Sequence, residues 1–187
     1  MIKLKIINGI DVNKFLEISN AVKERPELAK FQFHVKNTWM KGGHSRSVIK
    51  GFFGAGKKDS TRVSPFLNEN DFPVTLLGNN LGPIPVEYAL NALAGCLTAS
   101  IVYHAASKGI NLDDVESELM GNFDLQTFLG MQSKNANYYE NIKMKIRING
   151  HNLSVKDKKL LIELGKRSSM VFNVITNPFP VSVSIEN

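Results

Sequence analysis

The sequence predicts an α+β fold built mainly from antiparallel sheet. Several segments alternate apolar and polar residues, which is typical of strands with one buried face. One long apolar stretch runs from Ile84 to Ala106 and indicates a long helix. In chain order the predicted elements are β, α, β, β, long α, β, β, α and β, without sustained βαβ alternation or an internal repeat. At 187 residues, 43% of them hydrophobic, the chain is expected to form one domain, residues 1–187.

The N-terminal part predicts a strand, a helix and a hairpin. KLKII forms the first strand, and residues 11–25 form an amphipathic helix because their apolar residues recur at roughly helical intervals until Pro26. FQFHVKNTW and HSRSVIKGFF both alternate and are separated by the turn MKGG, which predicts a hairpin. Residues 54–73 are rich in Gly, Lys, Asp and Asn, so we expect loops with one short extended piece.

A long helix is expected to begin at Pro85 and to end near Gly109. Proline is tolerated in the first turn, and glycine can end a helix in the left-handed conformation. The apolar stretch is long enough to span a bilayer, but it contains Glu87, Asn91 and His104. These polar residues favour a helix buried in the protein, with no membrane partner.

The C-terminal part predicts three strands and one helix. Residues 113–126 and 139–149 alternate, the second segment very regularly. Ser154 is a candidate N-cap for a helix in SVKDKKLLIELGKR, which ends in basic residues. FPVSVSIEN is expected to close the chain as a final strand.

Cysteine content and charge bound the location and the partners. The single cysteine cannot form an internal disulfide, and MIKLKIINGIDV lacks the apolar core of an export signal, so a cytoplasmic location is expected. The net charge of +6 comes from lysines spread among acidic residues. Nucleic-acid binding is therefore the least favoured reading, since aromatic and basic residues do not interleave in any one strand pair.

Neither the glycine-rich segment nor the histidines of the sequence indicate a cofactor site. GFFGAGKK fits the spacing of a phosphate loop, but Lys58 stands where the Ser or Thr belongs and no helical pattern follows, so a glycine-rich hairpin end is favoured. The four histidines have no short metal-ligand spacing among themselves or with Cys96. We expect no cofactor and no metal.

Cys96 leaves two interpretations open from the residues alone. Free cysteine is among the most buried residue types and often acts as a small apolar side chain. Cys96 lies about 16 Å from the start of the predicted helix, where the helix dipole no longer stabilises a thiolate. A reactive Cys96 therefore needs a cation brought to it from elsewhere in the fold.

The run LLGNNLGPIPVEYALNALAGCLTASIVYHAASKGINLDDVE resembles the signature of the OsmC/Ohr family of thiol peroxidases, where a Pro-x-Glu segment opens a long helix with the reactive cysteine. GNFDLQTFLGM, NYYENIKMKIRI and KRSSMVFNVITNPFPVSV resemble the segments that follow it in the family. WMKGGHSRSVIKGFF resembles the family's first hairpin. The resemblance runs from about Phe31 to the end, so residues 1–30 are expected to be an N-terminal extension.

The resemblance implies an intertwined homodimer that reduces hydroperoxides, often organic ones, in the response to oxidative stress. In the family, a cysteine thiolate attacks the peroxide oxygen, and an arginine of the first hairpin and an acid near the helix start hold the thiolate. Carried over to this chain, Cys96 is the peroxidatic cysteine, Arg46 the best candidate for the arginine, and Arg62 a second candidate. Glu87 falls near the acid, although Val86 directly follows the proline here.

The sequence differs from the two-cysteine members of the family at one position that matters for the chemistry. Ser169 stands where two-cysteine members carry the resolving cysteine, so an external thiol is expected to complete the reaction. The sequence leaves a second function open, in which the same fold binds a small hydrophobic ligand at the dimer interface without catalysis.

Overall fold

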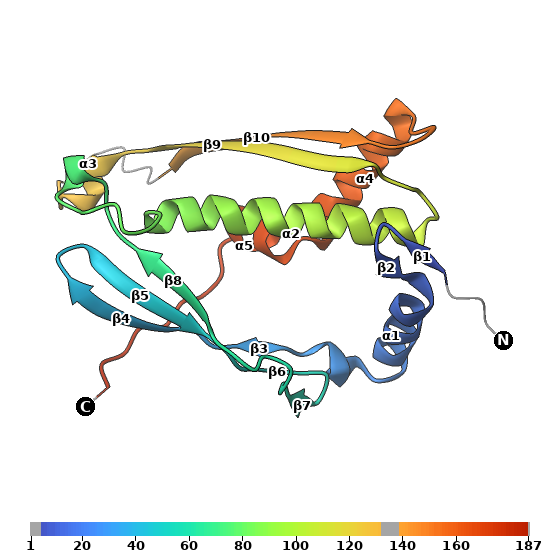
Figure 1. Ribbon diagram of the computed structural model, residues 1–187, viewed down its shortest axis with the longest axis horizontal. Coiled ribbons are helices and arrows are strands. Elements are labelled where there is room, and N and C mark those ends of the chain that lie inside the picture. The colour runs from blue at the N-terminus through green and yellow to red at the C-terminus, as the bar shows by residue number, and fades with distance from the viewer. Residues whose placement is uncertain (1–4, 132–138, 187) are drawn as a thin grey trace. The chain divides into compact units, whose positions relative to one another are not determined.

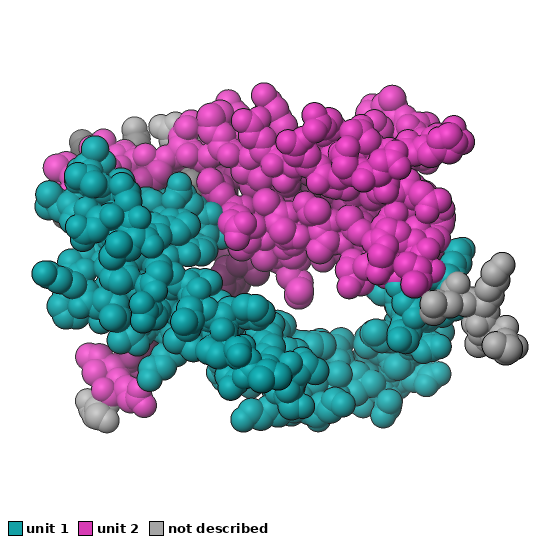
Figure 2. Space-filling model, viewed as in Figure 1, with its two compact units in different colours: residues 1–5, 11–89 teal, residues 6–10, 90–187 magenta. Residues whose placement is uncertain are grey.

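The computed structural model describes residues 5–131 and 139–186. The chain divides into two compact units, shown in Figure 2: unit 1 contains residues 1–5 and 11–89, and unit 2 contains residues 6–10 and 90–187. Figure 1 labels the helices and strands of both units. Each unit is built from both helix and antiparallel strands, so the α+β prediction is confirmed.

Unit 1 begins with the helix α1, Val12–Glu24, which matches the predicted helix closely. The Asp11 carboxylate caps it by accepting the Lys14 N–H at 3.1 Å. A short 3₁₀ turn, Pro26–Ala29, follows because proline cannot continue the α-helical hydrogen bonding. Of the first predicted strand, residues 3–7, residues 3 and 4 lie outside the described residues; the structure has β1, Ile6–Ile7, paired with β2, Ile10–Asp11.

The predicted hairpin is confirmed as β4, Lys36–Lys41, and β5, His44–Ile49, which pair antiparallel. The sequence predicted one short extended piece within residues 54–73, whereas the structure has two, β7, Lys57–Lys58, and β8, Phe66–Asn70. β8 pairs with the other edge of β5 and completes a three-stranded sheet. The central strand β5 places Arg46 opposite Thr38 on β4 and opposite Glu69 on β8.

A second sheet of unit 1 consists of β3, Gln32–Phe33, β6, Phe52–Gly54, and β7, Lys57–Lys58. β6 and β7 form a tight hairpin whose turn contains Ala55 and Gly56, both with positive φ. GFFGAGKK therefore forms a hairpin end, as the sequence predicted, and it opens no helix. The rings of Phe31, Phe33 and Phe52 stack on one another, with centroids 5.4 to 6.1 Å apart.

The loop between β8 and the long helix is organised around Asp71, which is 1% exposed. One carboxylate oxygen accepts the Phe72 N–H at 2.8 Å, and the other accepts those of Asn79 at 2.9 Å and Leu81 at 3.2 Å. Burial acts to raise the pKa of Asp71, but the three backbone donors outweigh it and lower the pKa below 3.8. This loop includes the short 3₁₀ turn Val74–Leu76.

The long helix α2 runs from Pro85 to Ser107, as predicted, and Gly109 follows it with φ +75°. Its buried side chains recur every four residues at Leu93, Leu97, Ile101 and Ala105. Among the described residues, α2 is long and apolar enough to span a bilayer by length and composition, a test that core helices of soluble proteins also pass.

The alternation predicted two strands here, and unit 2 contains them as β9, Asp114–Phe123, and β10, Tyr139–Asn149. The structure shows that they pair antiparallel with each other. Figure 1 shows this ribbon running along α2. Ile148 of β10 joins Ile101 and Ala105 of α2 and Leu161 of α4 in the buried core. The outer face of the ribbon is charged, with Glu116 opposite Arg147 and Glu118 opposite Lys145. A short helix, α3, Leu125–Phe128, follows β9, and its first two residues belong to the segment 113–126 that the sequence predicted as strand.

The predicted second helix is α4, Val155–Ser168, with Ser154 as its N-cap. Ser154 and Asp157 form a reciprocal capping box at the first turn. Gly165 permits α4 to approach α2 closely, because a Cβ at this position would lie 2.8 Å from a side-chain carbon of Ile101. A further helix, α5, Met170–Thr176, was not predicted.

The expected final strand is wrong for the single chain. Residues 179–186 of the predicted strand form neither helix nor strand in the structure, although their apolar and polar residues alternate, and Asn187 lies outside the described residues. A strand requires backbone partners, and none of the described residues pairs with this segment. Val181, Val183 and Ile185 are 72%, 93% and 91% exposed.

Candidate functional site

Cys96 lies half-buried in the middle of α2. Its carbonyl accepts the Ser100 hydroxyl at 2.9 Å, one turn further along the helix. At about 100° of rotation per residue, Cys96 lies at the border between the buried stripe and the exposed Ala92 and Ala99. The thiol is therefore next to a surface of small side chains, which gives a reactant or another chain close access to the helix.

The structure places Arg46 in a charged cluster on the β5–β8 strand pair. The Arg46 Nε–H donates to Glu69 Oε1 at 2.7 Å, and the ring nitrogen Nε2 of His44 lies 2.7 Å from Glu69 Oε2. The hydrogen bond from His44, followed by that from Arg46, lowers the pKa of Glu69 below 4.5. Glu69 is therefore ionised at neutral pH, and Arg46 has a carboxylate partner within its own sheet.

Glu69 also connects this sheet to the start of α2. Its backbone carbonyl accepts the Tyr88 hydroxyl at 2.7 Å. Sequence reasoning missed both Glu69 and His44. Part of this cluster could have been found in the sequence. His44 and Arg46 are two residues apart on a predicted strand, so their side chains lie on the same face of the sheet. What the sequence lacked was the register that sets Glu69 opposite Arg46.

Glu87 lies in the first turn of α2 and is exposed. Its Oε2 accepts the Ile84 N–H at 3.0 Å, which satisfies one of the donors at the helix start. The structure thus gives Glu87 a local capping bond. Arg46 and Glu87 belong to unit 1 and Cys96 to unit 2, so a role for either residue at the thiol stays a prediction.

Arg62, the second candidate for the cation, lies elsewhere in unit 1. Its guanidinium is 5.0 Å from the ring centroid of Phe52 and 5.4 Å from that of Phe66. It also donates to the Lys50 carbonyl at 3.3 Å. These contacts hold the Arg62 side chain beside Phe52 of β6 and Phe66 of β8.

Ser169, in the expected place of a resolving cysteine, is fully buried. It lies between α4 and α5, and its hydroxyl oxygen accepts the Phe172 N–H at 3.1 Å as the N-cap of α5. Its carbonyl accepts the Asn173 side-chain amide at 2.8 Å. Ser169 therefore has a structural role at the junction of α4 and α5.

No group of three or more His, Cys, Asp or Glu side chains suited to a metal ion occurs within residues 5–131 and 139–186. His104, eight residues after Cys96 on α2, instead places Nε2 2.6 Å from the Ser168 hydroxyl of α4. Burial, with a smaller contribution from Lys108, lowers the pKa of His104 below 6.5. His104 is therefore neutral at physiological pH and connects two helices of unit 2.

The chain is an α+β protein with a half-buried cysteine in the middle of its long helix, and comparisons with known proteins identify its family. The model of a family described as OsmC-like protein matches residues 78–184, more than half of the sequence. The chain belongs to the OsmC-like protein family. A search of curated proteins finds no match.

Solved structures agree in fold. An OsmC-like protein from Mycoplasma pneumoniae superposes with a TM-score of 0.58 at 14% identity, covering 78% of this chain and 87% of that chain. A structure from Legionella pneumophila, described as an organic hydroperoxide resistance protein OsmC and predicted redox protein, gives a TM-score of 0.53 at 14% identity, covering 77% and 88%. At such identities the likeness shows a shared fold.

Proposed function

We propose that this chain is a thiol-dependent peroxidase that reduces hydroperoxides through Cys96 and uses an external thiol to complete the reaction. The observation that carries the proposal is the half-buried Cys96 at the centre of α2, on the helix that the OsmC-like family match covers. The hydroperoxide resistance named for the Legionella structure supports a redox role for this family.

The proposed reaction begins with the Cys96 thiolate attacking one oxygen of the hydroperoxide. The O–O bond breaks, the other oxygen takes a proton and leaves as an alcohol, and Cys96 becomes a sulfenic acid. An external thiol then condenses with the sulfenic acid, releasing water and forming a mixed disulfide. A second external thiol reduces that disulfide, which restores Cys96 and releases the oxidised reductant.

An external reductant is proposed because the chain holds no second cysteine. Ser169 has no sulfur, and its hydroxyl is buried and bonded to the Phe172 N–H. In this scheme Arg46 is the cation that stabilises the thiolate. It must share its charge between the thiolate and Glu69, or exchange one partner for the other.

We further propose that the protein is a cytoplasmic homodimer. The family resemblance supports the dimer, and so do two surfaces that the single chain leaves uncovered. One is the alternating segment of residues 178–186, which has no strand partner among the described residues. The other is the exposed face of α2 at Ala92, Gly95 and Ala99, where small side chains permit close approach of a second backbone.

The experiment that tests the catalytic proposal measures peroxide consumption by purified protein, with an organic hydroperoxide and with hydrogen peroxide. Monothiol and dithiol reductants are supplied in turn. We expect turnover with at least one external thiol, and we expect Cys96→Ser to abolish it while leaving the fold intact by circular dichroism. Ser107→Ala, also on α2, is the matched control and should retain activity.

Mass spectrometry of Cys96 after a single addition of peroxide, without reductant, follows the chemical step itself. Trapping of a sulfenic acid by dimedone is expected in the native protein. Absence of both the trapped adduct and peroxide consumption in the folded native protein would contradict the proposal.

A second function is favoured by one observation, the existing ion pair between Arg46 and Glu69. If Arg46 stays with Glu69, no cation is assigned to the thiol, and the fold would serve to bind a small hydrophobic ligand at the dimer interface. Ligand binding that is unchanged in Cys96→Ala, together with no turnover by any reductant, would favour this alternative.

A further inference from the structure

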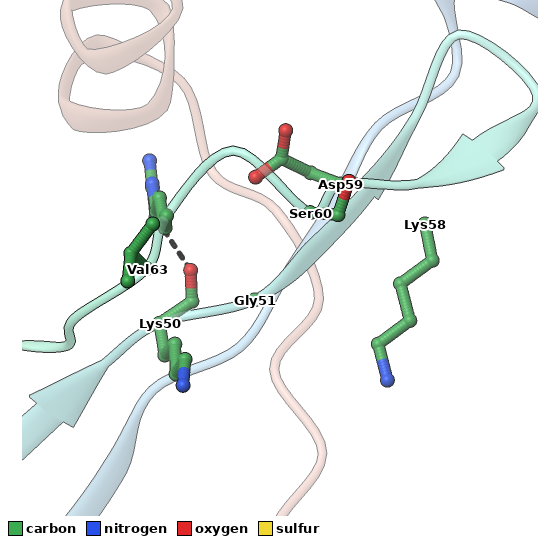
Figure 3. Close-up of a pocket in the computed structure, with 7 residues that line it drawn as sticks. Lys50, Gly51, Lys58, Asp59, Ser60 and Val63 are labelled. Atoms are coloured by element: carbon green, nitrogen blue, oxygen red, sulfur yellow. Dashed lines mark hydrogen bonds between the residues drawn. The ribbon is translucent and has the colours of Figure 1, made fainter.

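Unit 1 contains two neighbouring pockets around the β6–β7 hairpin, and neither is lined by Cys96, Arg46 or Glu87. The larger one, of about 590 Å³, is drawn in Figure 3. It is lined by Lys50, Gly51, Lys58, Asp59, Ser60, Arg62 and Val63. The smaller one, of about 350 Å³, is lined by His34, Gly51, Phe52, Phe53 and Lys58. Gly51 and Lys58 line both, so the two pockets adjoin.

We propose that these adjoining pockets bind a small molecule in which a phosphate group is attached to an aromatic ring system, as in a mononucleotide. The larger pocket takes the phosphate and the smaller one takes the ring. This binding site is independent of Cys96 and goes beyond the proposed peroxidase function.

The charge of the larger pocket suits an anion. Three of its lining residues, Lys50, Lys58 and Arg62, are cations, and Asp59 is its one acidic residue. Neither lysine forms an ion pair with any residue of the described ranges. Figure 3 shows the Lys50 and Lys58 side chains extending to one side of the backbone and the Asp59 carboxylate to the other. Neither ammonium group is therefore neutralised by a carboxylate of the described residues.

Arg62 is held in place before any ligand arrives. Its guanidinium lies against the rings of Phe52 and Phe66 and donates to the Lys50 carbonyl. The planar guanidinium keeps further N–H donors that match phosphate oxygens. Because its position is fixed by these contacts, less conformational entropy is lost when a ligand binds.

Asp59 helps to shape the segment that carries Arg62. Its Oδ1 accepts the Thr61 hydroxyl at 2.8 Å, and this bond is the main cause of its lowered pKa. Its other oxygen, Oδ2, is buried and has no hydrogen-bond partner among the described residues. The carboxylate therefore offsets one of the three positive charges and leaves a net positive pocket.

The smaller pocket suits a flat ring. Phe52 and Phe53 line it together with His34. Phe52 also belongs to the stacked group with Phe31 and Phe33, which fixes its ring. Because the Phe52 ring is already in contact with Arg62, Phe31 and Phe33, the ring of Phe53, which is 44% exposed, is the one on which a ligand ring can stack. Aromatic side chains stack on nucleobases with little dependence on the base.

Gly51 explains how a ligand reaches across both pockets. A Cβ at this position would meet no atom within 4 Å, so the glycine leaves open space where the pockets join. Gly51 is absent from the residues with positive φ, so a larger side chain is compatible with its backbone. Substitution at Gly51 therefore fills space without straining the chain.

The test is a calorimetric titration of the full chain with adenosine 5′-monophosphate, inorganic phosphate and adenosine. We expect the nucleotide to bind more tightly than either of its parts. Lys58→Gln and Arg62→Gln should each weaken binding roughly tenfold, as expected for loss of one hydrogen bond to a charged group. Gly51→Leu should abolish binding while its thermal unfolding stays close to that of the native protein.

Lys57→Gln is the matched control, because Lys57 is the neighbour of Lys58 on β7 and lines neither pocket. Equal weakening by Lys57→Gln and Lys58→Gln would overturn the proposal, since it would indicate general attraction to a basic surface. Binding of adenosine equal to that of the nucleotide would overturn the phosphate site. Tight binding of a single-stranded oligonucleotide, with none of the mononucleotide, would replace the small molecule with a nucleic acid.

Discussion

Asp71 is a buried side chain whose charge depends on three backbone donors. The N–H groups of Phe72, Asn79 and Leu81 all point at its carboxylate, and together they fix the loop that leads into α2. An aspartate in a loop of Asn, Gly and Pro residues gives no sign of this in the sequence. The role of Asp71 depends on the path of the loop, which brings the N–H groups of residues eight and ten positions later to its carboxylate.

Asp71→Asn is expected to lower the free energy of unfolding at neutral pH, because the amide offers one acceptor where the carboxylate offers two. The folded-state pKa of Asp71 lies below 3.8, so the charged carboxylate stabilises the fold above that pH. This contribution is lost as the pH falls through the folded-state pKa. Urea unfolding as a function of pH should therefore show a smaller difference between native protein and variant in acid than at neutral pH. A constant difference would contradict this reading.

Ser169 is a structural residue in the position where the family resemblance implied chemistry. Ser169→Ala is expected to destabilise the protein by about 1 kcal/mol, since it removes the N-cap acceptor for the Phe172 N–H. Denaturant unfolding measures the change. Ser182→Ala, at an exposed position in the C-terminal segment, is the control and should change stability little. Equal effects of the two substitutions would show that the cap is unimportant.

Among the elements, the pairing of α2 with α4 depends on one glycine. Gly165→Leu is expected to destabilise the fold by about 1 to 3 kcal/mol, because its Cβ and branches meet Ile101 and Leu97 of α2. This happens although leucine has the higher helix propensity, which by itself would stabilise α4 by up to about 1 kcal/mol. Denaturant unfolding, with Lys159→Leu at an exposed position of α4 as the control, separates packing from propensity. A gain in stability for Gly165→Leu would contradict the close packing.

Elements with long periodic patterns were predicted well from the sequence. β10 alternates through Ile142, Met144, Ile146 and Ile148, and α2 is apolar over many turns, so local residues determine both. α5 was missed because it has seven residues, too few for a helical period to stand out. The four-residue α3 was missed for the same reason, and its first two residues were assigned to the preceding strand. Tertiary contacts, more than local pattern, select such short elements.

At the scale of the whole molecule, the C-terminal segment distinguishes a single chain from the proposed dimer. Deletion of residues 178–187 is expected to shift the protein from dimer to monomer, if this segment forms its strand by pairing with a second copy. Light scattering after size-exclusion chromatography measures the mass. Replacing Val181, Val183 and Ile185 with serine, at unchanged length, should have the same effect because it removes the apolar face. A monomeric native protein, or a dimer that survives both changes, would contradict this prediction.

The sequence alone determined the fold class, the long cysteine-bearing helix, the first hairpin and the two strands β9 and β10, because the pattern of each element depends on residues close in the chain. It also identified the family resemblance that the comparison confirmed. The tertiary structure decided which side chains meet across strands. It placed Glu69 against Arg46 and His44, and it buried Ser169 as a helix cap. The Glu69 contacts join residues 23 and 25 positions apart, so they depend on sheet register, and periodicity within one strand does not specify which strand lies beside it. The burial of Ser169 depends on the packing of α4 and α5, which no local pattern specifies.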